Sequence, residues 1–271
     1  MELFGLKSEQ FVLGDPIEVK LSKALSVARL KLRNSDIIAV TSKVVSLSER
    51  NVVSLASVKP SARAKKLGEK LGMVHEFVQI VLNEADAVYG GVSGAILTIK
   101  NGDAIANSGV DRKNAPSDHV VPWPVNPQHS ANRIRRALKR KLRKNIGVVI
   151  VDSRVTPLRL GTTGLAIACS GFQPVRDYRG VKDIYGRQTR ITLQAIADGI
   201  AAAAHVLMGE ARESVPFVLV RDAPIRLGRG NNSYTLTIST KNCLYMSQMP
   251  RPFQPRVAAD PQRMSRKENR R

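Results

Sequence analysis

Residues 129–145, HSANRIRRALKRKLRKN, lead almost directly into residues 147–153, GVVIVDS, and this pair of stretches decides the fold class. The first stretch carries apolar residues at helical spacing, which form one stripe: Ala131, Ile134, Leu138 and Leu142. Asn126 and Pro127 suit the N-cap and first turn of that helix, and we expect Gly147 to end it. The second stretch is a short apolar run, typical of a buried strand. A helix that feeds a buried strand predicts mixed α and β structure.

Helices and strands alternate irregularly on both sides of this pair. Helical spacing predicts helices over 19–32, 61–72, 76–86 and 191–211. The helix over 191–211 is apolar nearly all round, so we expect it to be buried. Short apolar runs predict strands over 35–42, 94–109 and 216–222. The fold class is therefore α+β, a mixed α/β chain with mixed sheets.

The chain has 271 residues, of which 43% are apolar, enough for one large domain or two modest ones. We expect one catalytic unit over residues 1–250, and a division with a second subdomain around 120–190 is an alternative. Residues 251–271 form a basic tail whose composition is typical of disorder.

The formal net charge of +21 predicts attraction to polyanions, which include nucleic acids, nucleotides, phosphorylated cofactors and acidic substrates. The two cysteines, Cys169 and Cys243, are too few for a disulfide scaffold and fit a reducing, cytoplasmic location. Cys169 lies in an apolar run, and we expect it to be buried. We expect no secretory signal at the start of the chain and no membrane span.

Common catalytic motifs are absent from the sequence. There is no phosphate-binding loop of the GxxxxGK[ST] type, no GxGxxG turn, no HExxH, no CxxC and no GxSxG. If the chain is an enzyme, we expect carboxylates and an oxygen-ligated metal to carry the chemistry.

Acidic residues follow two of the expected strands. Asp111 follows the strand over 94–109, and Asp152 ends GVVIVDS together with Ser153. Two carboxylates at strand ends can converge on one Mg²⁺ or Mn²⁺ ion, to which Ser153 could add a hydroxyl ligand. The alternative is local: Asp111 forms an Asx-turn, and Asp152 caps the turn that follows its strand.

Residues 162–190 form a glycine-punctuated, charged segment that contains Arg176. Arginine suits carboxylate and phosphate groups, so Arg176 is a candidate catalytic residue. An internal salt-bridge network at a subunit contact is the alternative.

Five blocks, spread over about residues 35–222, resemble in order the coenzyme F-420:L-glutamate ligase family: DIIAVTSKVVS, ANSGVD..N, GVVIVDS, GFQPVRDYRGVKDIYGR and IADGIAAAAHVLMGEA. The resemblance implies a GTP-dependent ligase that joins L-glutamate to the lactyl carboxylate of the glutamate-free deazaflavin precursor. It also implies a divalent metal, Mn²⁺ or Mg²⁺, and a monovalent cation such as K⁺. The implied fold is gamma-glutamyl-ligase-like, in an intertwined homodimer.

The resemblance also implies roles for individual residues. Nucleotide contacts fall on Ser42, Lys43, Asn114, Met208, Gly209, Glu210 and Ala211. Metal ligands fall on Asp111, Asp152, Ser153 and Glu210. Together with Arg176, Asp111 and Asp152 would act in forming an acyl phosphate, which the glutamate amine then attacks.

Two positions depart from the family pattern. Leu47 stands where the family has a lysine that contacts GTP, and Gly199 stands where the family has a glutamate. They keep open a divergent ligase that acts on another carboxylate. The basic helix over 133–144 keeps open a third hypothesis, a nucleic-acid-binding protein. Aromatic residues are only 4% of the chain, which offers few stacking platforms, so we expect small-molecule substrates rather than nucleic acid.

Overall fold

The computed structural model describes residues 1–228 and 235–253. The chain forms two compact units. The first unit comprises Met1–Val52 and Val121–Ile238, and the second comprises Val53–Val120 and Ser239–Arg271. The compact unit that interrupts the first one is therefore built around residues 53–120, whereas the sequence placed a second subdomain around 120–190.

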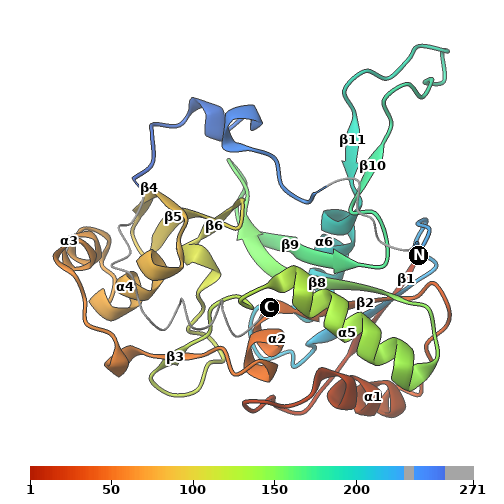
Figure 1. Cartoon of the computed structure of the whole chain (residues 1–271), viewed down its shortest axis with the longest axis horizontal. Helices are drawn as coiled ribbons and strands as arrows, with labels where there is room; N and C mark the ends of the chain where they lie inside the picture. Colours follow the sequence, from red (N-terminus) through yellow and green to blue (C-terminus); the bar gives the residue numbers. More distant parts are fainter. Residues whose placement is uncertain (229–234, 254–271) are drawn as a thin grey trace. The chain divides into compact units, whose positions relative to one another are not determined.

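A five-stranded sheet forms the centre of the first unit (Figure 1). Its strands lie in the order β1 (Glu2–Leu6), β12 (Phe217–Arg221), β2 (Ile37–Thr41), β8 (Gly147–Val155) and β9 (Thr162–Ser170). The pair β2 and β8 is parallel, and every other pair is antiparallel. The expectation of a mixed sheet in a mixed α/β chain is confirmed.

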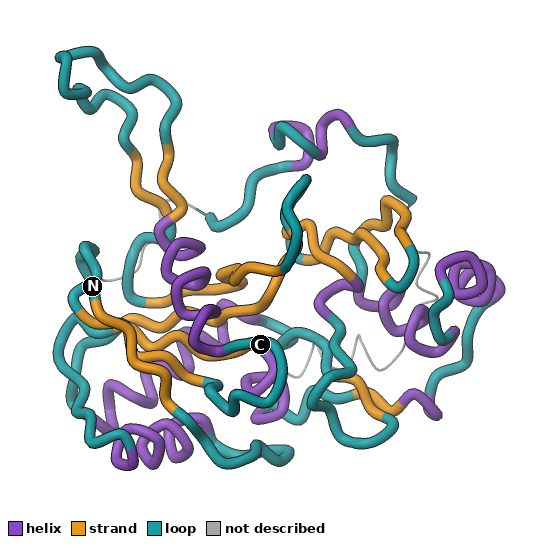
Figure 2. Tube along the Cα trace, turned by 180° about the vertical axis from the view of Figure 1, so that it is seen from behind, coloured by secondary structure: helices purple, strands orange, loops and turns teal. Residues whose placement is uncertain are grey.

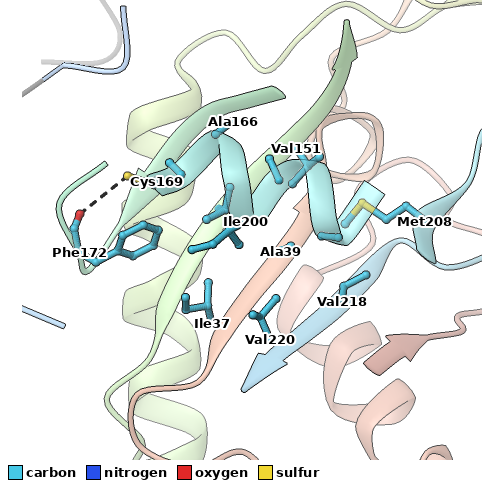
Figure 3. Packing of buried hydrophobic residues seen from close by; sticks show 14 residues of the cluster. Ile37, Ala39, Val151, Ala166, Cys169, Phe172, Ile200, Met208, Val218 and Val220 are labelled. Atoms are coloured by element: carbon cyan, nitrogen blue, oxygen red, sulfur yellow. Dashed lines mark hydrogen bonds between the residues drawn. The ribbon is translucent and has the colours of Figure 1, made fainter. Parts of the chain in front are cut away.

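Helices cover both faces of this sheet (Figure 1). On one face, α6 (Ile196–Met208) packs into a cluster with β2, β8, β9 and β12, through contacts such as Ile200 against Ala39 and Val220 (Figure 3). On the other face lies α5 (Pro127–Leu142), beside α1 (Ile17–Val27). The short helix α2 (Ser42–Ser48) follows β2 directly. The strands β2 and β12 and most of β8 and β9 are buried on both sides, which explains their continuous apolar runs.

The helix α5 begins as expected, because the Asn126 side chain accepts a hydrogen bond from the His129 N–H at 2.9 Å. Its end differs from the prediction. The helix stops at Leu142, and Arg143 takes the left-handed cap with φ of 52°. Gly147 therefore does not end the helix but begins β8.

The helix α6 is shorter and less buried than its composition indicates. Residues Leu193–Ala195 form the strand β11, which pairs with β10 (Val175–Asp177) in an arm that extends from the unit (Figure 2). One face of α6 is buried, but Val206 on the other face is 80% exposed. Expecting the whole helix to be buried was wrong, because alanine is compatible with either environment.

An ion pair is buried at the edge of the sheet where β2 begins. Arg221 ends β12 and donates two hydrogen bonds to the carboxylate of Asp36, at 3.1 and 2.9 Å. Both side chains are at most 5% exposed. The hydrogen bonds to Asp36 raise the pKa of Arg221, which stays charged at every pH of interest.

The second unit holds a three-stranded antiparallel sheet of β4 (Ala87–Val92), β5 (Ala95–Lys100) and β6 (Asp103–Ala106). The helices α3 (Ala62–Leu71) and α4 (His75–Glu84) share a hydrophobic cluster with β4 and β5. A short pair, β3 (Val53–Ser54) with β7 (His119–Val120), completes its strands. The sequence predicted a single strand over 94–109, but Asn101 and Gly102 turn the chain with positive φ and make a hairpin.

Short 3₁₀ turns occupy Leu55–Ser57, Asn107–Gly109, Thr240–Asn242 and Met246–Gln248. The first residues of the expected tail are ordered in the second unit, where Phe253 pairs with Val88 through two backbone hydrogen bonds, at 2.9 and 3.0 Å. The remainder of that tail, 254–271, lies outside the described residues. No helix within residues 1–228 and 235–253 has the length and apolar character needed to cross a membrane.

Candidate active site

One edge of the five-stranded sheet gathers most of the expected site residues. The strand β2 ends there, and so does its parallel pairing with β8, at Thr41 opposite Val151. The antiparallel strand β12 begins there, and its preceding residue, Pro216, accepts a hydrogen bond from the Thr41 N–H at 3.0 Å. The carboxyl ends of parallel strands are where open α/β sheets bind ligands. We call this edge the β2–β8 edge.

Ser42 and Lys43 reach this edge because α2 starts immediately after β2. The Ser42 side chain is nearly buried at 7% exposure, while Lys43 is partly exposed. Leu47, one turn further along, is only 5% exposed and packs into the core. Position 47 therefore offers hydrophobic packing here and no charge.

Asp152 lies one residue beyond the parallel pairing, at the same edge. The indole N–H of Trp123 donates a hydrogen bond to its Oδ2, and the Ser153 N–H donates to its Oδ1 at 2.8 Å. The strand β8 continues to Val155, so Asp152 and Ser153 lie inside the strand rather than at its end. The alternative in which Asp152 caps a following turn is wrong for the same reason.

The segment after α6 connects this helix to the beginning of β12. Met208 ends the helix, and Gly209 adopts φ of 69° and ψ of −173°, a conformation that favours glycine. Glu210 accepts a hydrogen bond from the Thr162 hydroxyl at 2.5 Å and lies 3.0 Å from the His205 Nε2. Because Thr162 pairs with Val155, Glu210 lies beside the last residues of β8, three residues beyond Asp152.

The carboxylate of Glu213 makes a local hydrogen bond within this segment. It accepts the Ala211 N–H at 2.8 Å. Hydrogen bonds from its own backbone N–H and from that of Ala211 lower the pKa of Glu213. The chain after Gly209 is therefore a turn whose backbone donors are held by the Glu213 carboxylate.

Asp111 and Asn114 belong to the second unit. Asp111 follows a left-handed turn in which Asn107, Ser108 and Gly109 all have positive φ. The buried Ser108 fixes that turn, since its N–H donates to Thr98 Oγ1 at 2.9 Å and its hydroxyl to the Val81 carbonyl at 3.0 Å. Left-handed conformations in consecutive non-glycine residues are strained and often mark function.

The Asp111 carboxylate accepts the Lys113 N–H at 2.7 Å, which is the Asx-turn of the local alternative. Asn114 is exposed and has φ of 54°. Asp111 and Asp152 are in different units, and their joint coordination of one ion stays a prediction.

Arg176 is not brought to the β2–β8 edge. It lies in β10 and donates hydrogen bonds to the Pro224 carbonyl and, at 3.3 Å, to the Tyr178 hydroxyl. Pro224 follows the end of β12, so Arg176 belongs to the opposite end of the sheet strands. With Phe172, Ile225 and Arg226 it lines a separate cavity of about 700 Å³.

The donors at these positions are of the kind that hard cations prefer: carboxylates of Asp152, Glu210 and Asp111, and the hydroxyl of Ser153. Within residues 1–228 and 235–253, no three His, Cys, Asp or Glu side chains gather into a metal site. Mg²⁺ is commonly held by one or two carboxylates, with water and phosphate oxygens completing its shell. The oxygen donors fit such an ion in chemical type.

Sequence reasoning missed three residues of the β2–β8 edge: Trp123, Thr162 and His205. Trp123 is the only tryptophan in the chain and is 2% exposed, which signals a structural role but does not name its partner. Thr162 and His205 lie 48 and 5 residues from Glu210. Only the closeness of His205 and Glu210 in sequence could have suggested their contact.

Comparison with known proteins places this chain in a family. The model of the F420-0:Gamma-glutamyl ligase family matches residues 5–222. A coenzyme F420:L-glutamate ligase of Methanococcus maripaludis strain C7 is 40% identical over 205 residues, which cover 75% of this chain and 82% of the relative.

Two further relatives carry the same name. The ligase of Methanopyrus kandleri is 36% identical over 79% of this chain and 87% of its own length. The ligase of Archaeoglobus fulgidus is 35% identical over 72% of this chain and 78% of its own. The match extends over both units and over all the site residues described above, and the chain belongs to the F420-0:gamma-glutamyl ligase family.

Proposed function

We propose that this chain is a GTP-dependent ligase that forms an amide bond between L-glutamate and the lactyl carboxylate of the glutamate-free coenzyme F420 precursor. Membership of the family and the names of the relatives support ligation of glutamate to this coenzyme. The observation that carries the proposal is the β2–β8 edge, where the parallel pairing of β2 with β8 brings Ser42, Lys43 and Asp152 together.

The chain's own residues would bind and orient the reactants. Lys43, in the first turn of α2, would bind phosphate oxygens of GTP, and the Met208–Ala211 segment would contact the nucleotide beside it. Ser42 and Asn114 would add hydrogen bonds. Asp111 and Asp152 would hold Mn²⁺ or Mg²⁺, with Ser153 and Glu210 as further oxygen ligands and K⁺ as an additional ion. A divalent ion supplies neutralisation of the charge on the transferred phosphoryl group.

The reaction needs activation because a carboxylate is a poor electrophile. Transfer of the γ-phosphoryl group to the lactyl carboxylate gives GDP and an acyl phosphate. The glutamate amine, after losing a proton, attacks the acyl carbon, and inorganic phosphate leaves. Trp123 contributes by holding the Asp152 carboxylate in one orientation, while Thr162 and His205 do the same for Glu210. We further propose that the protein acts in the cytoplasm as a homodimer.

The test is to incubate the protein with GTP, Mn²⁺, L-glutamate and the glutamate-free precursor, and to follow phosphate release and product mass. We expect phosphate release to depend on both acceptor and L-glutamate, with one glutamyl residue added per phosphate. Asp152→Asn should lose the activity, and Asp118→Asn, an exposed carboxylate of the second unit, should keep it. Phosphate release without amide product would contradict the proposal.

A ligase that uses another carboxylate acceptor is the second candidate. It is favoured by Leu47, which is packed in the core where the resemblance implies a lysine contact to GTP. Losing one charge-assisted hydrogen bond costs about 1.5–3 kcal/mol. Product formation with a different acid, but not with the deazaflavin precursor, would support this candidate over the first.

A further inference from the structure

The C-terminal part of α5 and the loop after α1 form a basic surface in the first unit. Two hydrogen bonds hold the loop beside the helix end: Ser35 N–H to the Asn145 carbonyl at 2.8 Å, and Asn145 N–H to the Asn34 side chain at 2.9 Å. We call this region the α5 surface. Its exposed basic side chains include Lys31, Arg33, Lys139, Arg140, Arg143 and Lys144.

Within residues 1–228 and 235–253, no acidic side chain pairs with the basic side chains of the α5 surface. Residues 19–35 and 119–151 contain no Asp or Glu at all. Asp36, the nearest carboxylate in sequence, is buried and paired with Arg221. Within the described residues, no ion pair involves any of the six basic side chains named above. Arg136 and Arg140 are exposed like charges four residues apart on α5, and such pairs repel. A polyanion bound here would relieve that repulsion.

The chemistry of the α5 surface narrows the choice of polyanion. The apolar stripe of α5, which includes Ile134 and Leu138, faces the core. None of the large exposed hydrophobic side chains falls in residues 126–147 or 28–36, which the structure describes in full. Interfacial membrane helices need an exposed apolar face, and single-stranded nucleic acids bind best where aromatic side chains stack on the bases. The α5 surface offers neither.

We propose that the α5 surface binds the phosphate backbone of double-helical nucleic acid, without regard to sequence. Arg and Lys contacts to phosphates supply non-specific affinity through counterion release. The last turn of α5, residues 139–142, extends about 6 Å. Arg143, Lys144 and the loop residues widen the basic surface beyond that turn, so that it can reach neighbouring phosphates. This interaction is separate from the ligase reaction. The low aromatic content led us to expect small-molecule partners only, and the proposal departs from that expectation.

The experiment uses the full chain and fluorescence anisotropy of a labelled 20-base-pair duplex, made once as DNA and once as RNA, over a series of KCl concentrations. The test variant replaces Lys139, Arg140, Arg143 and Lys144 by Gln. The matched control replaces Lys59, Lys65, Lys66 and Lys70 by Gln, and so removes the same charge from exposed positions at and before α3. A third variant exchanges Lys for Arg and Arg for Lys at the four α5 positions and keeps the charge. Thermal unfolding of each variant checks that it folds.

We expect duplex binding with a Kd of about 10⁻⁶ to 10⁻⁴ M near physiological salt. The affinity of the α5 variant for the duplex should be about ten-fold lower or more. The slope of log Kd against log salt concentration should fall by up to about 4, roughly 0.9 for each phosphate that the variant no longer neutralises. The control and the charge-keeping variants should bind like the parent chain. Binding of DNA and RNA duplexes alike points to the backbone, and preference for one identifies the helix form that fits.

Three results would overturn the proposal. One is the absence of duplex binding by the parent chain at low salt. Another is an equal loss of affinity in the α5 variant and the α3 control, which would assign binding to net charge alone. The third is tighter binding to vesicles of anionic lipid than to either duplex.

Discussion

Asp152 is oriented by a side chain that no motif marks, the indole of Trp123. The indole is buried, so its N–H would remain without a partner if Asp152 turned away, and that would cost free energy. The contact therefore fixes the carboxylate at the β2–β8 edge and also links the 121–126 loop to β8.

Trp123→Phe removes the donor and keeps an aromatic ring. We expect the free energy of unfolding to fall by about 1–3 kcal/mol, since a carboxylate oxygen loses its hydrogen bond and a small cavity opens. Urea unfolding measures this change. Tyr185→Phe, at a tyrosine that is 78% exposed, is the control and should leave stability unchanged. Equal stabilities for the two variants would show that the Trp123 contact contributes nothing.

Cys169 was expected to be buried, and this is confirmed at 1% exposure. Burial raises the pKa of the Cys169 thiol to about 12 by disfavouring the charged thiolate. At pH 8 the thiol therefore stays protonated and unreactive, and thiolate forms only as the pH approaches 12. Cys243 is partly exposed.

A thiol reagent at pH 8 should accordingly modify Cys243 quickly in the folded protein and Cys169 only after denaturation. Cys243→Ser should abolish the fast reaction while leaving one reactive thiol in denaturant. Fast modification of Cys169 in the folded Cys243→Ser variant would mean that its surroundings open readily.

Two glycines on neighbouring elements have opposite roles. A Cβ at Gly164 in β9 would lie 2.3 Å from the Ala201 carbonyl oxygen and 2.8 Å from the His205 Cβ, so this glycine lets α6 approach the strand. A Cβ at Gly199, on the exposed side of α6, would meet nothing within 4 Å. Helix propensity alone then decides the effect at position 199.

We expect Gly199→Ala to raise the free energy of unfolding by about 0.5–1 kcal/mol. Gly164→Ala should lower it, by an overpacking cost of about 1–3 kcal/mol, and should also disturb the contact between His205 and Glu210. Denaturant unfolding of both variants measures the difference. If Gly164→Ala were as stable as the parent chain, α6 would not be held by this close approach.

The predicted elements succeeded where local pattern and burial agree. The apolar stripe of α5 and the apolar run of β8 were enough to predict these two elements, because each element places its apolar residues toward the core. The end of β8 was missed, since Ser153 and Arg154 pair with β9 although their polarity is typical of a loop. The hairpin at Asn101–Gly102 was missed despite its sequence, which is a strong turn signal.

The candidate site was predictable in part. The resemblance supplied Ser42, Lys43 and Asp152, and the register of β2 and β8 brings them to one edge. The local sequence does not show that Arg176 lies away from the β2–β8 edge. Its position depends on the end of the sheet at which residues 172–177 follow β9.

The arm formed by β10 and β11 supports the proposed homodimer at the scale of the whole molecule. It exposes Ile184 at 91% and Ile191 at 86%, and exposed apolar side chains that gather in one segment often mark an interface. We expect Ile184→Asp combined with Ile191→Asp to convert a dimer to a monomer in light-scattering measurements. Val206→Asp, at an exposed residue of α6, is the control. A dimer that survives the double substitution would exclude the arm as its main contact.

The central proposal is that the carboxylates of Asp111 and Asp152 hold one divalent ion. The most direct measurement is Mn²⁺ affinity in the presence of GDP for the parent chain, Asp111→Asn, Asp152→Asn and the double variant. If the ion is shared, each single substitution should weaken binding strongly, and the double variant should bind little worse than either, because ligands of one ion are not additive. Unchanged affinity in either single variant, or losses that simply add in the double variant, would contradict a shared ion.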